Sequence, residues 1–165
     1  MPENVNLDTF DSALLTELQR DNQVPARILA QRVGLSESAV LRRLRRLRAD
    51  RIIVADVAVV HPAVLGTPLT VHVLVSLERE TPDLLDAFVR RLRARPEVTA
   101  AWYVTGEVDF IVHLQLAGMG AYEVFAREVF HADPNVRGFR TIIAMRQVAG
   151  TPVSVALPIG PARES

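Results

Sequence analysis

The sequence contains no cysteine and no lysine. Without cysteine the chain can form neither a disulfide framework nor a thiolate metal site, and this usage is typical of proteins in the reducing cytoplasm. Long hydrophobic runs are also missing: the stretch from Ile52 to Val60 is interrupted by Asp56 and is far too short to cross a bilayer. No basic start is followed by an apolar run, so we expect no signal peptide and a cytoplasmic location.

The chain also lacks net charge, because its 19 basic residues, all arginine, are balanced by 19 acidic residues. This balance excludes a wholly basic nucleic-acid-binding protein but leaves room for a local basic patch. A GC-rich genome is the simplest explanation for the exclusive use of arginine, although arginine also binds phosphate and guanine in a bidentate way. The hydrophobic content of 49% is high enough for a folded core, and 165 residues suit one average domain or two small ones.

Two short helices are predicted near the start of the chain. Apolar residues recur at helical spacing from Leu7 to Asp21, with Asp8 as the expected N-cap. A second helix fits Pro25 to Val33, with its proline at the first helical position. We expect Gly34 to end this helix in a left-handed conformation, which glycine adopts at little cost.

A third helix is predicted from Glu37 to about Asp50, capped by Ser36. One of its faces is apolar and packs on the first two helices, while six arginines within residues 36–51 make the rest basic. Three short helices with a glycine-containing turn before the third make a helix-turn-helix, whose third helix enters the DNA major groove. A solvated charged face is the alternative, but the preceding turn favours DNA binding. The predicted DNA-binding residues are Ser36, Ser38, Leu41, Arg42, Arg43, Arg45 and Arg46.

The second half of the chain repeats a strand-helix-strand unit. Alternating strands and helical stripes follow one another from Val71 to about Val148, and two Pro-Xaa-Val turns lie 134 − 96 = 38 residues apart. This order predicts a ferredoxin-like sheet with both helices on one face. Ile52 to Val60 is interpreted as a strand and linker. The predicted boundaries are 1–52 for the helix-turn-helix, 53–66 for the strand and linker, 67–150 for the α/β domain and 151–165 for a tail.

The other face of this sheet is predicted to be apolar. It should carry His72, Leu74, Tyr103, Ile111, Ile142 and Ala144, together with Ser76, Thr99 and Thr105. Such a face is unsuited to water, and the same face of a second subunit is its simplest cover. We expect Trp102 to point into the core instead. The four histidines show no metal-ligand spacing, so we expect them to be structural or surface residues.

The chain resembles the Lrp/AsnC, or feast/famine, transcription regulators of bacteria. The resemblance is carried by Leu7-Asp8-Xaa-Xaa-Asp11, by Leu29-Ala30-Xaa-Xaa-Val33-Gly34-Leu35-Ser36, by Val40 to Leu47, by Val104 to Phe110 and by Arg140-Thr141, and it covers roughly residues 7 to 149. It implies an α+β fold, with an N-terminal three-helix winged helix-turn-helix and a C-terminal ferredoxin-like βαββαβ (RAM) domain. It also implies homodimers formed through the RAM domain, assembly of these into octamers, and amino-acid effectors bound between subunits.

The same resemblance suggests an effector site around the turn from Gly106 to Asp109. Backbone amides in such a turn suit a carboxylate, and an acidic side chain suits an α-ammonium group, with Asp109 as the expected partner. The family usually has an aromatic residue where Val108 stands. The predicted effector-binding residues are Thr105, Gly106, Glu107, Val108, Asp109, Met119, Thr141 and Ile143.

The favoured function is a DNA-binding repressor or activator that is modulated by a small molecule and performs no catalysis. We expect no cofactor, because the sequence contains no Gly-rich phosphate loop and no nucleophile-elbow motif. One alternative is an enzyme, since sirohaem decarboxylases are built like these regulators, but we find no cluster of histidine with tyrosine and arginine. Another alternative is an orphan regulator without an effector, which the valine at position 108 keeps open.

Overall fold

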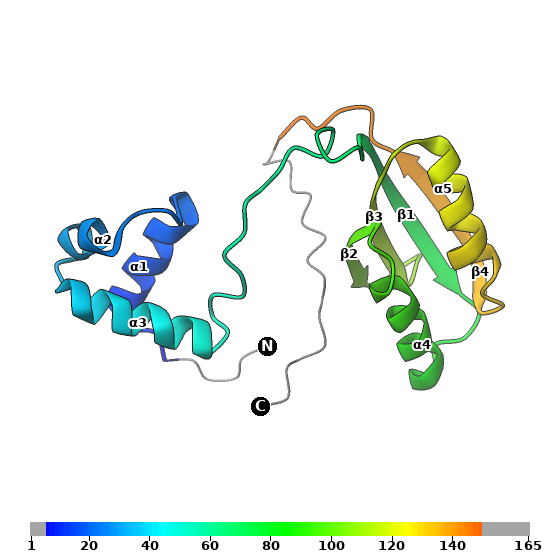
Figure 1. Cartoon of the computed structure of the whole chain (residues 1–165). Helices are drawn as coiled ribbons and strands as arrows, with labels where there is room; N and C mark the ends of the chain where they lie inside the picture. Colours follow the sequence, from blue (N-terminus) through cyan, green and yellow to red (C-terminus); the bar gives the residue numbers. More distant parts are fainter. Residues whose placement is uncertain (1–5, 150–165) are drawn as a thin grey trace. The chain divides into compact units, whose positions relative to one another are not determined.

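The computed structural model describes residues 6–149, which form two compact units divided between Ala58 and Val59 (Figure 1). Each unit has a hydrophobic core of its own. In the described part of the chain, no helix has the length and apolar character needed to cross a membrane. The tail predicted for residues 151–165 lies outside the described residues.

The first unit contains three helices, α1 (Thr9–Arg20), α2 (Ala26–Val33) and α3 (Glu37–Ala49). Asp8 caps α1 in a capping box with Asp11, and the Ser36 hydroxyl accepts a hydrogen bond from the Ala39 amide at the start of α3. Gly34 ends α2 with a φ of 71°, as predicted. Pro25 occupies the N-cap of α2, one residue before the predicted position. The buried apolar residues are Leu14, Leu29, Ala30, Val40, Leu44 and Leu47.

The segment after α3 differs from the prediction. Residues 53–66 form no strand, and residues 6–58 contain no strand that would make the helix-turn-helix winged. The apolar side chains of this segment are largely exposed, with Val54 at 86%. A strand needs a partner for its backbone N–H and C=O groups, and the described part of this chain offers none here. Local sequence preference alone therefore does not form the predicted strand.

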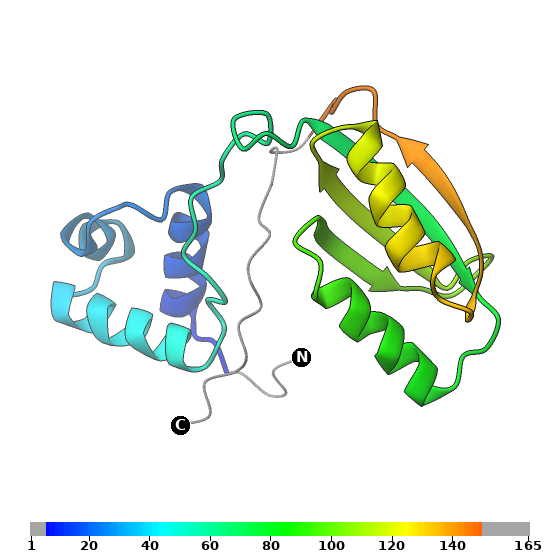
Figure 2. The ribbon, with the colours of Figure 1, turned by 45° about the vertical axis from the view of Figure 1, so that its right-hand side comes forward.

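The second unit is a four-stranded antiparallel sheet with two helical segments on one face (Figure 2). The strands β1 (Leu69–Leu77), β2 (Val98–Tyr103), β3 (Phe110–Leu116) and β4 (Val136–Ile143) are arranged in the order β2-β3-β1-β4. The helices are α4 (Pro82–Arg93) and α5 (Met119–Ala126), and α5 continues into one π-helical turn, η1 (Arg127–His131). The predicted ferredoxin-like fold is confirmed. Alternate residues of β1 and β3 are buried beneath the helices, as their alternation predicted.

The register of β2 corrects two predictions. Trp102 pairs with Ile111, and Tyr103 pairs with the buried Phe110. Directly paired residues point to the same face, so Trp102 lies on the open face and Tyr103 on the helix face. The prediction of a core tryptophan was wrong, because a register shift between Val98 and Ala100 reverses the alternation. The indole remains 48% exposed.

Candidate DNA interface and effector site

The exposed side of α3 carries two arginines without protein partners. Val40, Leu44 and Leu47 are buried against α1 and α2, which turns Arg42 and Arg45 outward. Both arginines are exposed, and within residues 6–149 neither makes a hydrogen bond or an ion pair. Leu41 is also exposed, and Ser36 and Ser38 lie at the start of the helix with hydroxyls 3.2 Å apart. This face presents guanidinium and hydroxyl donors that suit base edges and phosphates.

The other two arginines of the helix centre turn back to α1. Arg43 Nη1 donates to Asp11 Oδ1 at 2.8 Å and to Asp8 Oδ2 at 2.7 Å, and Arg46 Nη2 donates to Asp11 Oδ2. Asp11 is 0% exposed and is the only charged side chain that is buried in the described residues. Of the predicted DNA-binding residues, Arg43 and Arg46 are therefore bound within the protein.

The ion pairs of this unit affect its titration. The pKa of Asp8 is lowered, chiefly because its carboxylate accepts a hydrogen bond from the Asp11 amide. The pKa of Arg43 is raised above its usual value by its hydrogen bonds to Asp11 and Asp8. Farther along α3, Arg48 binds Asp56 at 2.8 Å, and this contact lowers the pKa of Asp56. These contacts thus favour the charged forms of the groups that take part in them.

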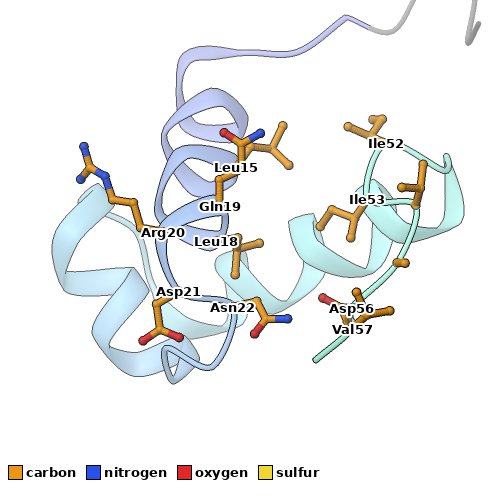
Figure 3. A pocket seen from close by; sticks show the side chains of 12 residues that line it. Leu15, Leu18, Gln19, Arg20, Asp21, Asn22, Ile52, Ile53, Asp56 and Val57 are labelled. Atoms are coloured by element: carbon orange, nitrogen blue, oxygen red, sulfur yellow. The ribbon is translucent and has the colours of Figure 1, made fainter. Parts of the chain in front are cut away.

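A shallow hollow lies where the segment after α3 crosses α1. It has a volume of about 500 Å³, and in Figure 3 Leu18 and Ile53 project towards each other across it, while Arg20 and Asp21 lie at its edge. Its lining mixes leucine and isoleucine with a few polar groups and contains no histidine. Among the described residues, no group of three or more His, Cys, Asp or Glu side chains could hold a metal ion.

In the second unit, the predicted effector turn is fixed to the end of β1. The Asp109 amide donates to Val75 O at 2.9 Å, and Asp109 Oδ2 accepts a hydrogen bond from the Leu77 amide at 2.6 Å. Gly106 has a φ of 133°, a conformation that favours glycine. One carboxylate oxygen of Asp109 is therefore hydrogen-bonded within the fold, and this contact could not be predicted from the sequence.

A small cavity of about 230 Å³ lies beside this turn. Glu107 and Arg140 both line it, and neither forms an ion pair within residues 6–149. Val108 is also part of the wall, as are Leu74, Ser76, Gly138 and Phe139. The cavity thus offers a carboxylate and a guanidinium, which match the ammonium and carboxylate groups of an amino acid. The sequence analysis did not assign Arg140 to the site; its place on β4 beside Leu74 depends on strand register.

The remaining predicted effector residues lie elsewhere in the chain. Thr141 pairs with Val73 and Ile143 pairs with Val71, so both are on the helix face of β4. Met119 and Thr141 line a second cavity, of about 530 Å³, where the Tyr122 hydroxyl is hydrogen-bonded to Thr141 Oγ1. Thr105 is exposed and belongs to the turn. The turn adjoins the Leu77 end of β1. Met119 comes shortly after β3, whose last residue pairs with Leu69, so it lies near the opposite end of β1, roughly 25 Å away along the strand. The structure therefore divides the predicted set into two groups.

The open face of the sheet carries a histidine pair at its centre. His72 and His113 are cross-strand neighbours with ring centroids 4.2 Å apart, and Trp102 lies 4.7 Å from His113. Ile142 pairs with His72 on the opposite side and is 46% exposed. Among the residues that the structure describes, no helix of this unit covers this face, because α4 and α5 both lie on the other one (Figure 2).

Comparisons with known proteins agree with this two-part construction. Residues 7–48 match the AsnC-type helix-turn-helix domain, and residues 70–153 match the Lrp/AsnC ligand binding domain. An uncharacterized HTH-type transcriptional regulator of Sinorhizobium fredii is 42% identical over 155 residues, which cover 94% of this chain and 90% of the relative. The leucine-responsive regulatory protein of Rhizobium meliloti is 34% identical over 148 residues, covering 90% and 95% of the two chains.

The similarity extends to solved structures. A transcriptional regulator from Neisseria meningitidis, in complex with L-methionine, has a TM-score of 0.80 and 26% sequence identity, and the match covers 90% of this chain and 96% of that one. Both family domains are thus present in the expected order, on a matching fold. The chain belongs to the Lrp/AsnC family of transcriptional regulators.

Proposed function

We propose that this DNA-binding transcriptional regulator contacts its target through the exposed face of α3. The observation that carries the proposal is the pair Arg42 and Arg45, two exposed guanidinium groups that have no ion-pair partner within residues 6–149. Each can bind guanine in a bidentate way or grip a phosphate, and Ser36, Ser38 and Leu41 complete the reading face. Arg43 and Arg46, which the sequence also predicts as DNA-binding residues, donate to Asp11 instead, so we do not expect them to contact DNA.

Replacement of Arg42 by alanine tests this assignment. A high-affinity duplex, selected from a random pool with the wild type, should lose about 1–3 kcal/mol of binding free energy if Arg42 contacts a base. A scrambled duplex should lose less, because it lacks the base partner. Arg137→Ala removes an exposed arginine from β4 and is the matched control, with affinity expected to stay unchanged. Equal affinities for wild type and Arg42→Ala on both duplexes would refute the assignment.

We also propose an amino-acid effector, supported by the relative that binds L-methionine. Its ammonium group would pair with Glu107 or Asp109, and its carboxylate with Arg140 and the amides of the Gly106 turn. Asp109 uses one carboxylate oxygen on the Leu77 amide, so Glu107 is the freer partner. Since Met119, Thr141 and Ile143 lie away from the turn in one chain, they would complete the site from a neighbouring subunit.

Thermal melting with each of the twenty amino acids tests the effector proposal. A ligand at one hundred times its dissociation constant adds about 2.7 kcal/mol of stability. Glu107→Gln and Arg140→Gln should each abolish this gain, while Asp86→Asn on α4, at an exposed residue that lines neither cavity, should keep it. No response to any amino acid would favour a regulator without an effector.

We propose that the open sheet face forms a homodimer, and that dimers assemble further into octamers. A face that exposes Trp102 and Ile142 is apolar enough for a self-complementary interface. In sedimentation equilibrium, Ile142→Arg should dissociate the dimer, whereas Val124→Arg, on the exposed side of α5, should not. A dimeric Ile142→Arg variant would contradict this interface.

We further propose that the protein works in the cytoplasm and without catalysis. Its relatives are transcriptional regulators, a role that requires binding to DNA and no chemical reaction on it. A change in the visible absorption spectrum of added sirohaem derivatives would instead support the enzyme alternative.

A further inference from the structure

The arginines at the centre of α3 fall into two groups that alternate along the helix. Arg42 and Arg45 have no partner in the described chain, whereas Arg43 and Arg46 both donate to the carboxylate of Asp11. Since one full turn of α3 contains both groups, the helix could present all four charges to a DNA backbone if Asp11 were absent. The division is therefore imposed mainly by Asp11 of α1, with Asp8 at the helix N-cap as a second acceptor for Arg43.

Asp11 is well suited to hold these two side chains. Both carboxylate oxygens are occupied, Oδ1 by Arg43 and Oδ2 by Arg46, and Oδ2 also accepts the Asp8 amide at 3.3 Å. The carboxylate is fully buried, and ion pairs with a buried member are screened little by salt. By contrast, the Glu17 to Arg20 pair on the same helix involves an arginine side chain that is 73% exposed. To bind Arg43 or Arg46, a DNA phosphate would have to displace the Asp11 carboxylate, which has no access to water.

We propose that Asp11 is a positioning residue for sequence-selective DNA binding, because it holds Arg43 and Arg46 away from the phosphate backbone and leaves contact to Arg42 and Arg45. This inference rests on the proposed role of α3. Phosphate contacts carry no sequence information, whereas base contacts distinguish sequences. On the selected duplex the base contacts fix where α3 lies, whereas on random DNA the protein can shift along the duplex until released arginines reach phosphates. Releasing two arginines would therefore strengthen binding to random DNA more than binding to the selected duplex.

The salt dependence of DNA binding by the full-length protein separates the two groups. Each phosphate contact contributes about 0.9 to the slope of log affinity against log salt concentration. The adjacent variants Arg45→Gln and Arg46→Gln are matched, since both remove one charge from an exposed position of α3. We expect Arg45→Gln to reduce the slope by about 1 per subunit and Arg46→Gln to leave it unchanged. Equal reductions would overturn the inference, whereas no reduction in either variant would overturn the proposed role of α3.

Asp11→Asn supplies the complementary test. It retains the shape of the side chain but removes the charge that holds Arg46 and one of the two carboxylates that hold Arg43, so the slope should increase by about 1 per subunit, and by up to about 2 when Asp8→Asn is added. The ratio of affinities for the selected and scrambled duplexes should fall, an effect that simple destabilisation of the fold would not produce. Adding Arg43→Gln and Arg46→Gln to Asp11→Asn should restore the wild-type slope. A triple variant with a slope well below wild type would show that these arginines already contact phosphate, and would overturn the inference even if Asp11→Asn alone folds poorly.

Discussion

The helix-turn-helix unit adds one charged cluster around a buried carboxylate to its apolar core, whereas the described core of the α/β unit is apolar throughout. Asp11 lies at the centre of the first unit and connects α1 to α3 through two arginines. The core of the second unit contains four phenylalanines and buried aliphatic residues from β1 and β3, and no charged side chain is buried among its described residues. The first unit places donors for DNA on one helix, while the second assembles its cavities from several strands.

Because of this difference, each unit is sensitive to a different kind of substitution. A charge substitution at Asp11 of the first unit should change which arginines of α3 are available to DNA. In the second unit, large effects on stability require the removal of core volume, and effects on ligand binding require side chains of the turn and of β4.

The largest effect is expected for Phe125→Ala. Phe125 is fully buried and contacts Phe130 at a centroid distance of 5.5 Å. Removing such a ring typically costs about 3–5 kcal/mol. Urea unfolding followed by the fluorescence of Trp102, the only tryptophan, should therefore shift strongly. The helical signal of the first unit should persist beyond that transition; loss of both signals together would contradict separate cores.

Asp109→Ala should have a medium effect on stability. It leaves the Leu77 amide at the end of β1 without its acceptor, and an unsatisfied group of this kind costs about 1–3 kcal/mol. Glu107→Gln, two residues earlier, removes a charge that has no ion-pair partner within residues 6–149 and should leave the unfolding midpoint unchanged. Denaturant unfolding of both variants decides the matter. Equal midpoints would mean that Asp109 is free for a ligand, as the sequence alone suggests.

The two helix starts should differ by a smaller amount. Ser36 accepts a hydrogen bond from the Ala39 amide, so Ser36→Ala should cost about 1 kcal/mol. Thr81 occupies the equivalent position of α4 but makes no side-chain hydrogen bond there. Thr81→Ala should therefore be nearly neutral, although both residues have the sequence signature of a cap. Thermal unfolding compares the two, and equal losses would show that the Thr81 hydroxyl contributes in solution.

Sequence patterns predicted those parts of the molecule in which one element determines its own environment. The buried face of α3 and the alternating burial of β1 and β3 follow from helical and strand periodicity. The family resemblance added the order of the two domains. Each of these features depends on residues that are close in sequence.

The features that were missed depend on pairing between distant residues. The shift between Val98 and Ala100 is a property of the β2–β3 ladder, so the alternation of β2 alone placed Trp102 on the wrong face. Asp11 has the signature of a capping residue, and its partner Arg43 is 32 positions away. Arg140 reaches the cavity at Glu107 through the β1–β4 register. For residues 53–66, the described part of this chain offers no partner strand.

The smallest effect is expected from pH, through His113. Burial lowers the pKa of His113, and the neighbouring His72 lowers it further. His113 faces His72 from β1 and Trp102 from β2, and no carboxylate forms an ion pair with it in residues 6–149. The unfolded chain binds this proton near pH 6.5, whereas the folded chain binds it only at lower pH. The contribution of His113 to the free energy of unfolding is therefore fully present above about pH 6.5 and decreases as the pH falls towards the folded-state pKa.

Urea unfolding followed by Trp102 fluorescence should give a lower midpoint at pH 5.5 than at pH 7.5. His113→Gln should reduce this difference, and His61→Gln, in an exposed loop, should retain it. An unchanged difference in His113→Gln would assign the pH dependence to other groups.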